Sequence, residues 1–448
     1  IEPALTLINM VNNDNGGNAD PAEWILSASG PSPFSGSGPS VSNQPGFLAG
    51  TYNLSETAAP AGYSSSDWVC TEGNQIDGNT VQLSIGENST CTISYDDIGA
   101  KLRIVKEVLN DHGGTVTNPN AFKLKIDGTE VLNNIFNEID AGSHTVSEVG
   151  LPGYQAADWG GDCAPDGSIT LDLEQEATCT LTNDDISPTL TVVKTIVNDD
   201  GGTITDPNVF DLRVDGQTVI HNQQIEYDAG AYVVSESGSQ EYEASEWGGD
   251  CNPDGSITLS SGQGAVCSIT NDDIPATLTI RNIVVNNNGG TVTEPDAFGL
   301  KVNGVAVSHD MVIEYEPGNY TVSMEGLTGY KASDWNGDCD SNGNITLSLG
   351  QNYTCTITND DIAATVKVVN TVVNDNGGIT TDPNAFGLQV NGQGILHDTV
   401  RELDAGDYFV SEIGLEGYQA GDWGGDCDTG GNITLALAQV ATCTITND

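Results

Sequence analysis

Basic residues are scarce in this chain. Its 448 residues include 12 Lys and Arg against 64 Asp and Glu, which gives a formal net charge of −52. A surface of that sign repels the phosphates of nucleic acids and the headgroups of anionic lipids. We therefore expect no nucleic acid partner, and the charge is typical of a saline or calcium-containing exterior that screens it.

Long apolar runs and catalytic signatures are missing as well. No segment reaches the roughly 18 to 20 apolar residues of a membrane-spanning helix, so membrane insertion is not expected. No charged-then-apolar signal sequence precedes Ile1, which predicts a mature chain or a piece of a longer one. The sequence has no nucleophile elbow, phosphate-binding glycine loop or His/Cys cluster, so we expect no enzyme and no catalytic residue.

The sequence contains five tandem copies of one repeat unit. The unit recurs at steps of about 88 residues, which is long enough for each copy to bury a core of its own. The first copy is a variant, because the spacing between its two cysteines is longer. The predicted domains are 1–97, 98–185, 186–273, 274–361 and 362–448.

The pattern within each unit predicts an all-β fold. In the third copy, Thr189–Val197 alternates as a strand, and Phe210–Val214 is expected to begin a second strand. Asp215-Gly216 is the signal of a two-residue hairpin, and three other copies have Asp-Gly or Asn-Gly at the same place. About seven strands per unit favour an immunoglobulin-like β-sandwich. No Gly/Ser spacer separates the units, so we expect the tandem array to be a stiff rod.

The ten cysteines fall into five pairs, one in each unit. There is no C-x-x-C motif and no neighbouring His ligand, so the pairs predict disulfides in an extracellular or cell-surface protein. We expect each disulfide to stabilise its unit as a structural brace. The predicted pairs are Cys70 with Cys91, Cys163 with Cys179, Cys251 with Cys267, Cys339 with Cys355, and Cys427 with Cys443.

One box in the sequence resembles a known family. Ala49–Glu56, followed by Pro60–Tyr63, is similar to the signature box of the Cna B-type and SpaA-like (prealbumin-like) domains of bacterial surface proteins and pilins. Leu190–Thr195 looks like the first strand of that family, and Ser268–Asn271 looks like its last. The resemblance recurs in all five units and implies tandem prealbumin-like sandwiches.

The resemblance also implies a covalent bond in two of the units. In that family, a Lys on the first strand can condense with an Asn on the last strand, assisted by a Glu. Such a reaction needs a buried, neutral amine and a protonated carboxyl group. The alternative is that the Lys side chain extends to solvent and the disulfide is the only brace. The matching residues are Lys106, Glu148 and Asn183 in the second unit and Lys194, Glu236 and Asn271 in the third.

The other three units depart from that pattern. Asn9, Asn282 and Asn370 stand where the Lys would be, and Met324 also replaces the Glu of the fourth unit. We therefore expect no such bond in these units.

Acidic residues are predicted to converge where one unit meets the next. If the first and last strands run in the same direction, the Asp-rich turn after the first strand lies near the exit of the last. Carboxylates there suit Ca²⁺, although Asn, Asp and Gly also simply form turns. No cofactor is required by the pattern. The candidate ligands are Asp14, Asp96 and Asp97; Asp111, Asp184 and Asp185; and Asp199, Asp200, Asp272 and Asp273.

The first unit also has an insert rich in Ser, Gly and Pro between Ser27 and Gly50. It carries Phe34 and Phe47, which are candidates for contact with a partner, and the alternative is a tolerated surface insertion.

Together these observations predict an extracellular structural protein that forms a disulfide-braced stalk or a filament of chains joined head to tail. Joining Asp448 to another Ile1 would nearly regenerate an internal junction, which fits either one period of a longer array or separate stacking subunits. The alternative is an adhesin whose loops, notably the insert, bind carbohydrate or a protein.

Overall fold

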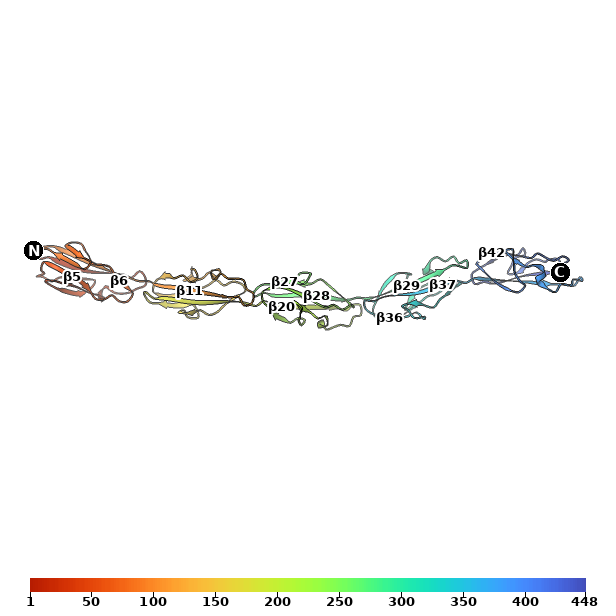
Figure 1. Ribbon diagram of the computed structural model, residues 1–448, viewed down its shortest axis with the longest axis horizontal. Coiled ribbons are helices and arrows are strands. Elements are labelled where there is room, and N and C mark those ends of the chain that lie inside the picture. The colour runs from red at the N-terminus through yellow and green to blue at the C-terminus, as the bar shows by residue number, and fades with distance from the viewer. The chain divides into compact units, whose positions relative to one another are not determined.

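The computed structural model describes residues 1–448 as five β-sandwiches built from ten sheets, without an α-helix (Figure 1). No helix has both the length and the apolar character that a membrane crossing requires. The chain divides into two compact units, which are considered separately. One contains residues 1–192, 214–235 and 248–267, and the other contains residues 193–213, 236–247 and 268–448.

The second repeat shows the plan of the sandwich. One sheet has the order β14-β11-β19-β16, with the short β17 also paired to β19, and the other has the order β13-β12-β15-β18. The elements are β11 (Ala100–Leu109), the 3-10 helix η2 (Pro119–Phe122), β12 (Lys125–Ile126), β13 (Thr129–Glu130), β14 (Asn137–Ile139), β15 (Gly142–Ser147), β16 (Tyr154–Ala156), β17 (Gly160–Gly161), β18 (Ser168–Leu171) and β19 (Glu176–Asp185).

The first repeat is the variant. Its sheets have the orders β4-β1-β10-β6, with β7 paired to β10, and β3-β2-β5-β9-β8. The elements are β1 (Ala4–Asn12), η1 (Pro21–Glu23), β2 (Ile25–Ser29), β3 (Phe34–Ser37), β4 (Ser40–Ser42), β5 (Gly50–Glu56), β6 (Tyr63–Ser65), β7 (Val69–Cys70), β8 (Asn74–Asp77), β9 (Thr80–Leu83) and β10 (Asn88–Asp97).

The third repeat contributes residues to both compact units. Its antiparallel pairs include β20 with β23, β24 with β27, and β25 with β28. The elements are β20 (Thr189–Val197), η3 (Pro207–Phe210), β21 (Arg213–Val214), β22 (Gln217–Thr218), β23 (Gln224–Glu226), β24 (Gly230–Ser235), β25 (Tyr242–Ala244), β26 (Gly248–Gly249), β27 (Ser256–Leu259) and β28 (Gly264–Asp273).

The fourth repeat has sheets of order β32-β29-β37-β34, with β35 paired to β37, and β31-β30-β33-β36. The elements are β29 (Ala276–Val285), η4 (Pro295–Phe298), β30 (Lys301–Val302), β31 (Val305–Ala306), β32 (Val312–Tyr315), β33 (Gly318–Ser323), β34 (Tyr330–Ala332), β35 (Asn336–Gly337), β36 (Asn344–Leu347) and β37 (Asn352–Asp361).

The fifth repeat has sheets of order β41-β38-β45-β43 and β40-β39-β42-β44. The elements are β38 (Ala364–Val372), η5 (Pro383–Phe386), β39 (Gln389–Val390), β40 (Gln393–Gly394), β41 (Val400–Leu403), β42 (Gly406–Ser411), β43 (Gly424–Gly425), β44 (Asn432–Leu435) and β45 (Val440–Asn447).

The first and last strands of a repeat are neighbours and run in parallel. Figure 1 shows β29 and β37 side by side, with Thr277 opposite Asn352 and Val285 opposite Asp360. The same pairing joins β1 with β10, β11 with β19, and β38 with β45. Alternation along β11 places Ala100, Leu102 and Ile104 in the core, as expected for a strand with one buried face.

The predicted two-residue hairpins are confirmed. Asp127 and Gly128 have φ angles of 49° and 80°, the left-handed conformation that a type I′ turn requires at both central positions. Asn303-Gly304 and Asn391-Gly392 adopt the same conformation.

The predicted strand at Phe210–Val214 is wrong at its start. Phe210 ends the 3-10 helix η3, and only Arg213 and Val214 form a strand. The Asp206 side chain accepts a hydrogen bond from the Asn208 N–H, and Asp211 adopts a left-handed φ of 46°, so the chain turns where an extended segment was expected.

The insert of the first repeat is part of the sandwich, which corrects the interpretation of Phe47 as a contact residue. Phe47 is 3% exposed and stacks on Tyr52 with ring centroids 4.5 Å apart. Phe34 on β3 packs edge-to-face against Phe47 and is partly buried. Phe47 therefore belongs to the core of the first repeat, and the partly exposed Phe34 covers it.

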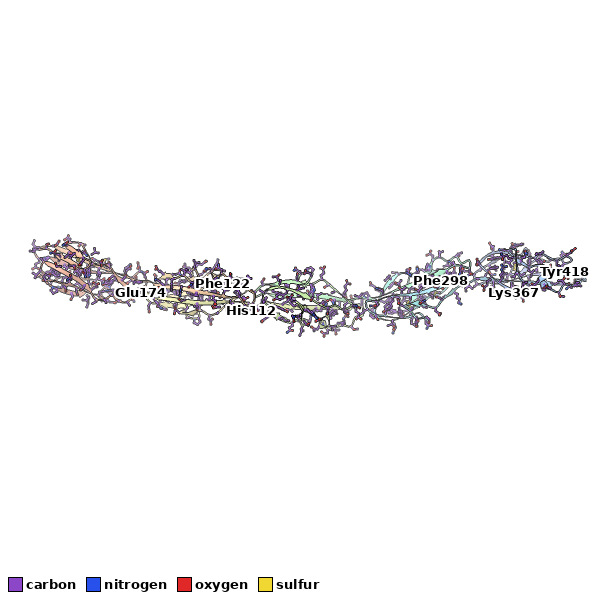
Figure 2. The ribbon with its side chains drawn as sticks, in the orientation of Figure 1. His112, Phe122, Glu174, Phe298, Lys367 and Tyr418 are labelled. Atoms are coloured by element: carbon purple, nitrogen blue, oxygen red, sulfur yellow. A yellow bond between two sulfur atoms is a disulfide. The ribbon has the colours of Figure 1, made fainter.

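An Ile residue between successive repeats forms a backbone hydrogen bond with each of the two repeats. The N–H of Ile98 donates to the Gly62 carbonyl of the first repeat, and the Ile98 carbonyl accepts from the N–H of Glu174 in the second repeat (Figure 2 labels Glu174). In the other compact unit, Ile362 makes the corresponding bonds with Gly329 and Ala438. Each of these repeats is thus attached to the next by backbone hydrogen bonds as well as by the chain.

Glycine is required at these contacts. A Cβ atom on Gly62 would lie 2.3 Å from Cβ of Leu173, and one on Gly329 would lie 2.6 Å from Cβ of Leu437. Both glycines also have positive φ angles. The close approach of one repeat to the next therefore depends on the missing side chain.

Candidate functional site

A buried polar cluster joins the first and last strands of the second repeat. The alternation that buries Ile104 also buries Lys106, two residues later on β11. Its Nζ lies 2.5 Å from Oε2 of Glu148, which directly follows β15, and also contacts Oδ1 of Asn183 on β19. The Asn183 Nδ2 donates to Glu148 Oε1 at 2.8 Å. The structure therefore brings together all three residues that the resemblance implied for this repeat.

An aromatic ring closes this cluster on one side, and sequence reasoning missed it. The Lys106 Nζ lies 4.6 Å from the centroid of the Phe122 ring, and Phe122 is fully buried. Figure 2 labels Phe122 in the second repeat. Tyr154 packs edge-to-face on the same ring. The signal was present in the sequence, because Phe210, Phe298 and Phe386 recur at the equivalent places, each at the end of a 3-10 helix.

The third repeat has the same pairing of a buried Lys with a Glu and with an aromatic ring. Lys194 Nζ lies 2.5 Å from Glu236 Oε2 and 4.4 Å from the centroid of the Phe210 ring. Asn271 is fully buried. We call 98–185 and 186–273 the lysine repeats.

Burial governs the electrostatics of both lysines. Removal from water lowers the pKa of Lys106, and the hydrogen bond and charge of Glu148 oppose that shift without cancelling it. The pKa of Lys194 is lowered for the same reason, against the opposing effect of Glu236. A lowered pKa increases the fraction of neutral amine, which is the nucleophilic form.

The remaining three repeats, here called the asparagine repeats, hold other groups at this place. In the fourth, Asn359 Nδ2 donates to Asn282 Oδ1 at 2.8 Å and contacts the Met324 sulfur. In the first, Asn9 and Tyr95 are buried. None of the three repeats has an amine at the cluster.

The fifth repeat keeps two of the three groups. Asn447 Nδ2 donates to Glu412 Oε2 at 2.8 Å and to Asn370 Oδ1 at 3.0 Å. Burial raises the pKa of Glu412, and the hydrogen bond from Asn447 opposes that rise. Only the amine is missing here.

Comparisons with known proteins agree with this architecture. A family model described as a prealbumin-like fold domain matches the chain five times, over residues 2–93, 97–181, 185–269, 273–357 and 361–445. The chain belongs to this family. The resemblance read from the signature box is therefore confirmed, and the five repeats are prealbumin-like domains.

Solved structures of similar fold include three bacterial proteins. The Bacillus anthracis TIE protein is 12% identical, with 77% of this chain and 67% of that chain covered and a TM-score of 0.36. Two B repeat units of the collagen binding protein of Staphylococcus aureus are 15% identical, with coverages of 78% and 99% and a TM-score of 0.18. The pilus adhesin SpaC from Lactobacillus rhamnosus GG is 10% identical, with coverages of 60% and 42% and a TM-score of 0.19. No curated protein matches the sequence.

Each prealbumin-like domain contains one disulfide, with the pairing expected from the sequence. Four of the bonds link cysteines 16 residues apart, and the bond between Cys70 and Cys91 spans 21. Cys179 lies on β19 and Cys163 lies just after β17, so the bond attaches a neighbouring segment to the last strand. Both of these cysteines are buried.

The acidic residues do converge at the end of the domains. Nine of the ten predicted carboxylates form three groups whose oxygens lie within 4.8 Å of one another, and only Asp200 is outside them. The groups are Asp14, Asp96 and Asp97; Asp111, Asp184 and Asp185; and Asp199, Asp272 and Asp273.

One carboxylate of each group is already engaged by the backbone. Asp97 accepts hydrogen bonds from the N–H groups of Asn15 and Gly17, and Asp185 accepts them from His112 and Gly114. Sequence reasoning did not anticipate this anchor, which ties the turn after the first strand to the last residue of the last strand. The fourth repeat has the same anchor at Asp361, although its turn is Asn286-Asn287-Asn288.

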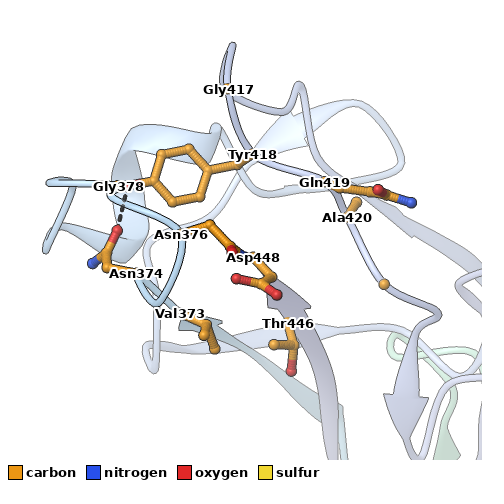
Figure 3. A pocket seen from close by; sticks show the side chains of 11 residues that line it. Val373, Asn374, Asn376, Gly378, Gly417, Tyr418, Gln419, Ala420, Thr446 and Asp448 are labelled. Atoms are coloured by element: carbon orange, nitrogen blue, oxygen red, sulfur yellow. Dashed lines mark hydrogen bonds between the residues drawn. The ribbon is translucent and has the colours of Figure 1, made fainter.

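In the fifth repeat, the corresponding turn borders a pocket of about 380 Å³ (Figure 3). Tyr418 donates a hydrogen bond to Oδ1 of Asn374 at 2.5 Å across it. Asp448 also lines the pocket, and a hydrogen bond with Asp375 raises its pKa. Gly417, which lines the pocket, has no atom within 4 Å of where a Cβ would lie.

The carboxylate anchor gives a pH prediction. Burial alone raises the pKa of Asp361, but hydrogen bonds from the N–H groups of Gly290, Asn288 and Asn287 outweigh it, so the net pKa is lowered. A carboxyl group with a lowered folded-state pKa stabilises the fold above its unfolded pKa of about 4, and this contribution is lost as the pH falls through the folded-state value. Asp361→Asn should cost about 1–3 kcal/mol at neutral pH, and the difference from the parent chain should disappear in acid.

Hydrogen exchange of residues 286–292 in the full chain measures this effect. We expect exchange about 10- to 100-fold faster in the variant at neutral pH, since about 1.4 kcal/mol corresponds to a factor of ten. Asp360→Asn, at the exposed neighbouring residue, is the control. Equal exchange in parent and Asp361→Asn would show that the carboxylate does not anchor the turn.

Proposed function

We propose that the chain is an extracellular structural protein, a stalk or filament segment of covalently braced prealbumin-like domains, and not an enzyme. The observation that carries this proposal is the link between the first and last strands of each domain. Load enters a domain at its first strand and leaves at its last, and these two strands are direct neighbours. The disulfides support an extracellular location, where they persist.

We further propose that the lysine repeats form an intramolecular amide bond. The neutral Nζ of Lys106 attacks Cγ of Asn183, the new C–N bond forms, and the carboxamide C–N bond breaks. The nitrogen of Asn183 leaves as ammonia, taking up the proton that Lys106 loses. Glu148, in contact with both groups, takes a proton from the Lys106 ammonium, which leaves the amine neutral, and then donates that proton to the carboxamide. We propose the same reaction for Lys194, Glu236 and Asn271, because Lys194 pairs with Glu236 and Asn271 is fully buried.

The intact mass of the reduced, denatured chain tests this chemistry. We expect the parent chain to be lighter than its sequence mass by two ammonia molecules, because two domains have the complete cluster. Glu148→Gln should restore one ammonia, since an amide side chain cannot shuttle the proton. Glu130→Gln, at an exposed residue of the same domain, should restore none. A parent chain of full sequence mass would refute the bond.

The internal joints also support head-to-tail association of chains. Leu173 and Leu437 pack under glycines of the preceding domain. Ile85 of the first domain holds the equivalent place before its second cysteine and is 79% exposed. We propose that Gly417, in the fifth domain of a second copy of the chain, packs on Ile85. This contact would repeat those of Gly62 with Leu173 and of Gly329 with Leu437.

Sedimentation at increasing protein concentration tests this association. Ile85→Asp should abolish or strongly weaken end-to-end complexes, because the joint would bury an unpaired carboxylate. Ile76→Asp is the matched control, since Ile76 is 55% exposed on β8 of the same domain. A monomeric parent chain at all concentrations, or equal loss in both variants, would contradict the head-to-tail contact.

An adhesin that binds carbohydrate or a protein is the second candidate function. The insert gives it little support, because Phe47 belongs to the core and Phe34 packs against Phe47. No other loop observation favours it over a structural function.

We also propose Ca²⁺ as a ligand of the three acidic groups at the domain ends. In each group one carboxylate anchors the turn, which leaves two others, such as Asp14 and Asp96, to contribute oxygens.

Calcium titration followed by thermal melting tests this proposal. Ca²⁺ at saturating concentration should raise the melting temperature, and a chelator should reverse the effect. Asp14→Asn/Asp111→Asn/Asp199→Asn should remove the calcium response, whereas Asp166→Asn, at an exposed loop residue, should keep it. A melting temperature unchanged by Ca²⁺ would exclude the sites.

A further inference from the structure

The two kinds of repeat differ in how load can pass through them. In every repeat, tension acts on the start of the first strand and the end of the last strand, because these are the points where the chain enters and leaves. The two strands are parallel, so tension pulls them along their length in opposite directions. All hydrogen bonds between β29 and β37, from Thr277 to Val285, therefore share the load. Such a ladder resists force until it fails as a whole.

The extension of a repeat after its ladder fails depends on the cluster between the strands. In the fourth and fifth domains, only hydrogen bonds join the side chains of the cluster, from Asn359 to Asn282 and from Asn447 to Asn370. In the first domain, Asn9 donates to the Pro21 carbonyl instead. Nothing covalent then connects the first strand to the last except the chain itself, since the disulfide joins only a neighbouring segment to the last strand. In the lysine repeats, an amide bond between Lys106 and Asn183 would carry the load directly and leave residues 107–182 outside its path.

We propose that the chain is a load-responsive extender, with two locked domains and three that unfold reversibly under tension to a limit set by their disulfides. This inference rests on the amide bonds proposed above. It assigns the extension to 1–97, 274–361 and 362–448, and it assigns resistance without extension to the lysine repeats. The chain would absorb a sudden pull without breaking and without losing its covalent continuity.

The disulfides set the length that each domain releases. In the fourth domain, about 70 residues lie in the load path outside the loop closed by Cys339 and Cys355, and at roughly 3.5 Å per residue they extend to about 240 Å. The loop of 16 residues stays closed until the bond is reduced. The first domain closes a longer loop of 21 residues, so reduction releases more chain there than in the other two.

Single-molecule pulling of the full chain from its two ends tests the proposal. We expect three unfolding events, each lengthening the chain by about 200–240 Å, since the folded length must be subtracted from the extended one. With a reductant, two of the events should lengthen by about 55 Å more and one by about 70 Å more. The event with the larger increase in length on reduction is then the unfolding of the first domain.

Two variants should change the number of unfolding events in opposite directions. Lys106→Arg removes the nucleophile and should give a fourth event. Asn370→Lys supplies the missing amine beside Glu412 and Asn447, so it should lock the fifth domain and leave two events. Asn282→Lys is the matched control, because Met324 occupies the place of the Glu and the count should remain three. If Lys106→Arg fails to fold, the Asn370→Lys arm still decides.

The outcomes separate this inference from the proposed amide bonds. Five events in a parent chain that has lost two ammonia molecules would overturn the load-path argument while the bonds stand. Five events in a chain of full sequence mass would instead overturn the bonds, and with them this inference. Three events from the asparagine repeats, assigned by the reductant increments, would support it.

Discussion

The parallel pairing of the first strand with the last is the constraint on which the rest of this structure depends. It places the entry and exit strands of the chain next to each other, so that one strand ladder closes the whole repeat. Parallel strands cannot be joined by a short hairpin, and here the entire remainder of the sandwich forms the connection between them. The cluster around Lys106, the disulfide and the carboxylate anchor all attach to this pair of strands.

The positions of the polar groups result from that pairing. β11 and β19 are neighbours in one sheet, so their buried side chains lie side by side on the same face. Lys106 and Asn183 are therefore in contact although they are far apart in the sequence. An amine in such a place loses its hydration, and the neighbouring carboxylate only partly compensates for the loss. The same geometry with Asn in place of Lys gives a hydrogen-bonded amide pair and no reactive group. In the fifth domain, which keeps Glu412 and Asn447, this one substitution is the whole difference at the cluster from the lysine repeats.

The acidic composition has a structural explanation in part. Asp97, Asp185, Asp273 and Asp361 each accept backbone N–H groups from the turn after the first strand. A carboxylate is well suited to this task, because it offers several acceptor sites to donors that converge from one turn. The exposed acids beside them do not anchor the turn in this way, and they are the source of the negative charge at the domain ends.

The sequence by itself determined the number of repeats, the all-β fold, the hairpin turns and the pairs of cysteines, because these depend on periodicity and on local turn chemistry. It also indicated which domains have a Lys, a Glu and an Asn at the places of the cluster. It did not reveal that Phe47 lies in the core, that Phe210 ends a 3-10 helix, or that Phe122 covers the Lys106 amine. The 3-10 helix that Phe210 ends does have a local signal, the capping residue Asp206 followed by Pro207, but the Phe210 ring is buried only once the sandwich is formed. The burial of Phe47 and the contact between Phe122 and Lys106 are decided only by the tertiary structure, because each depends on which distant segment packs against the residue.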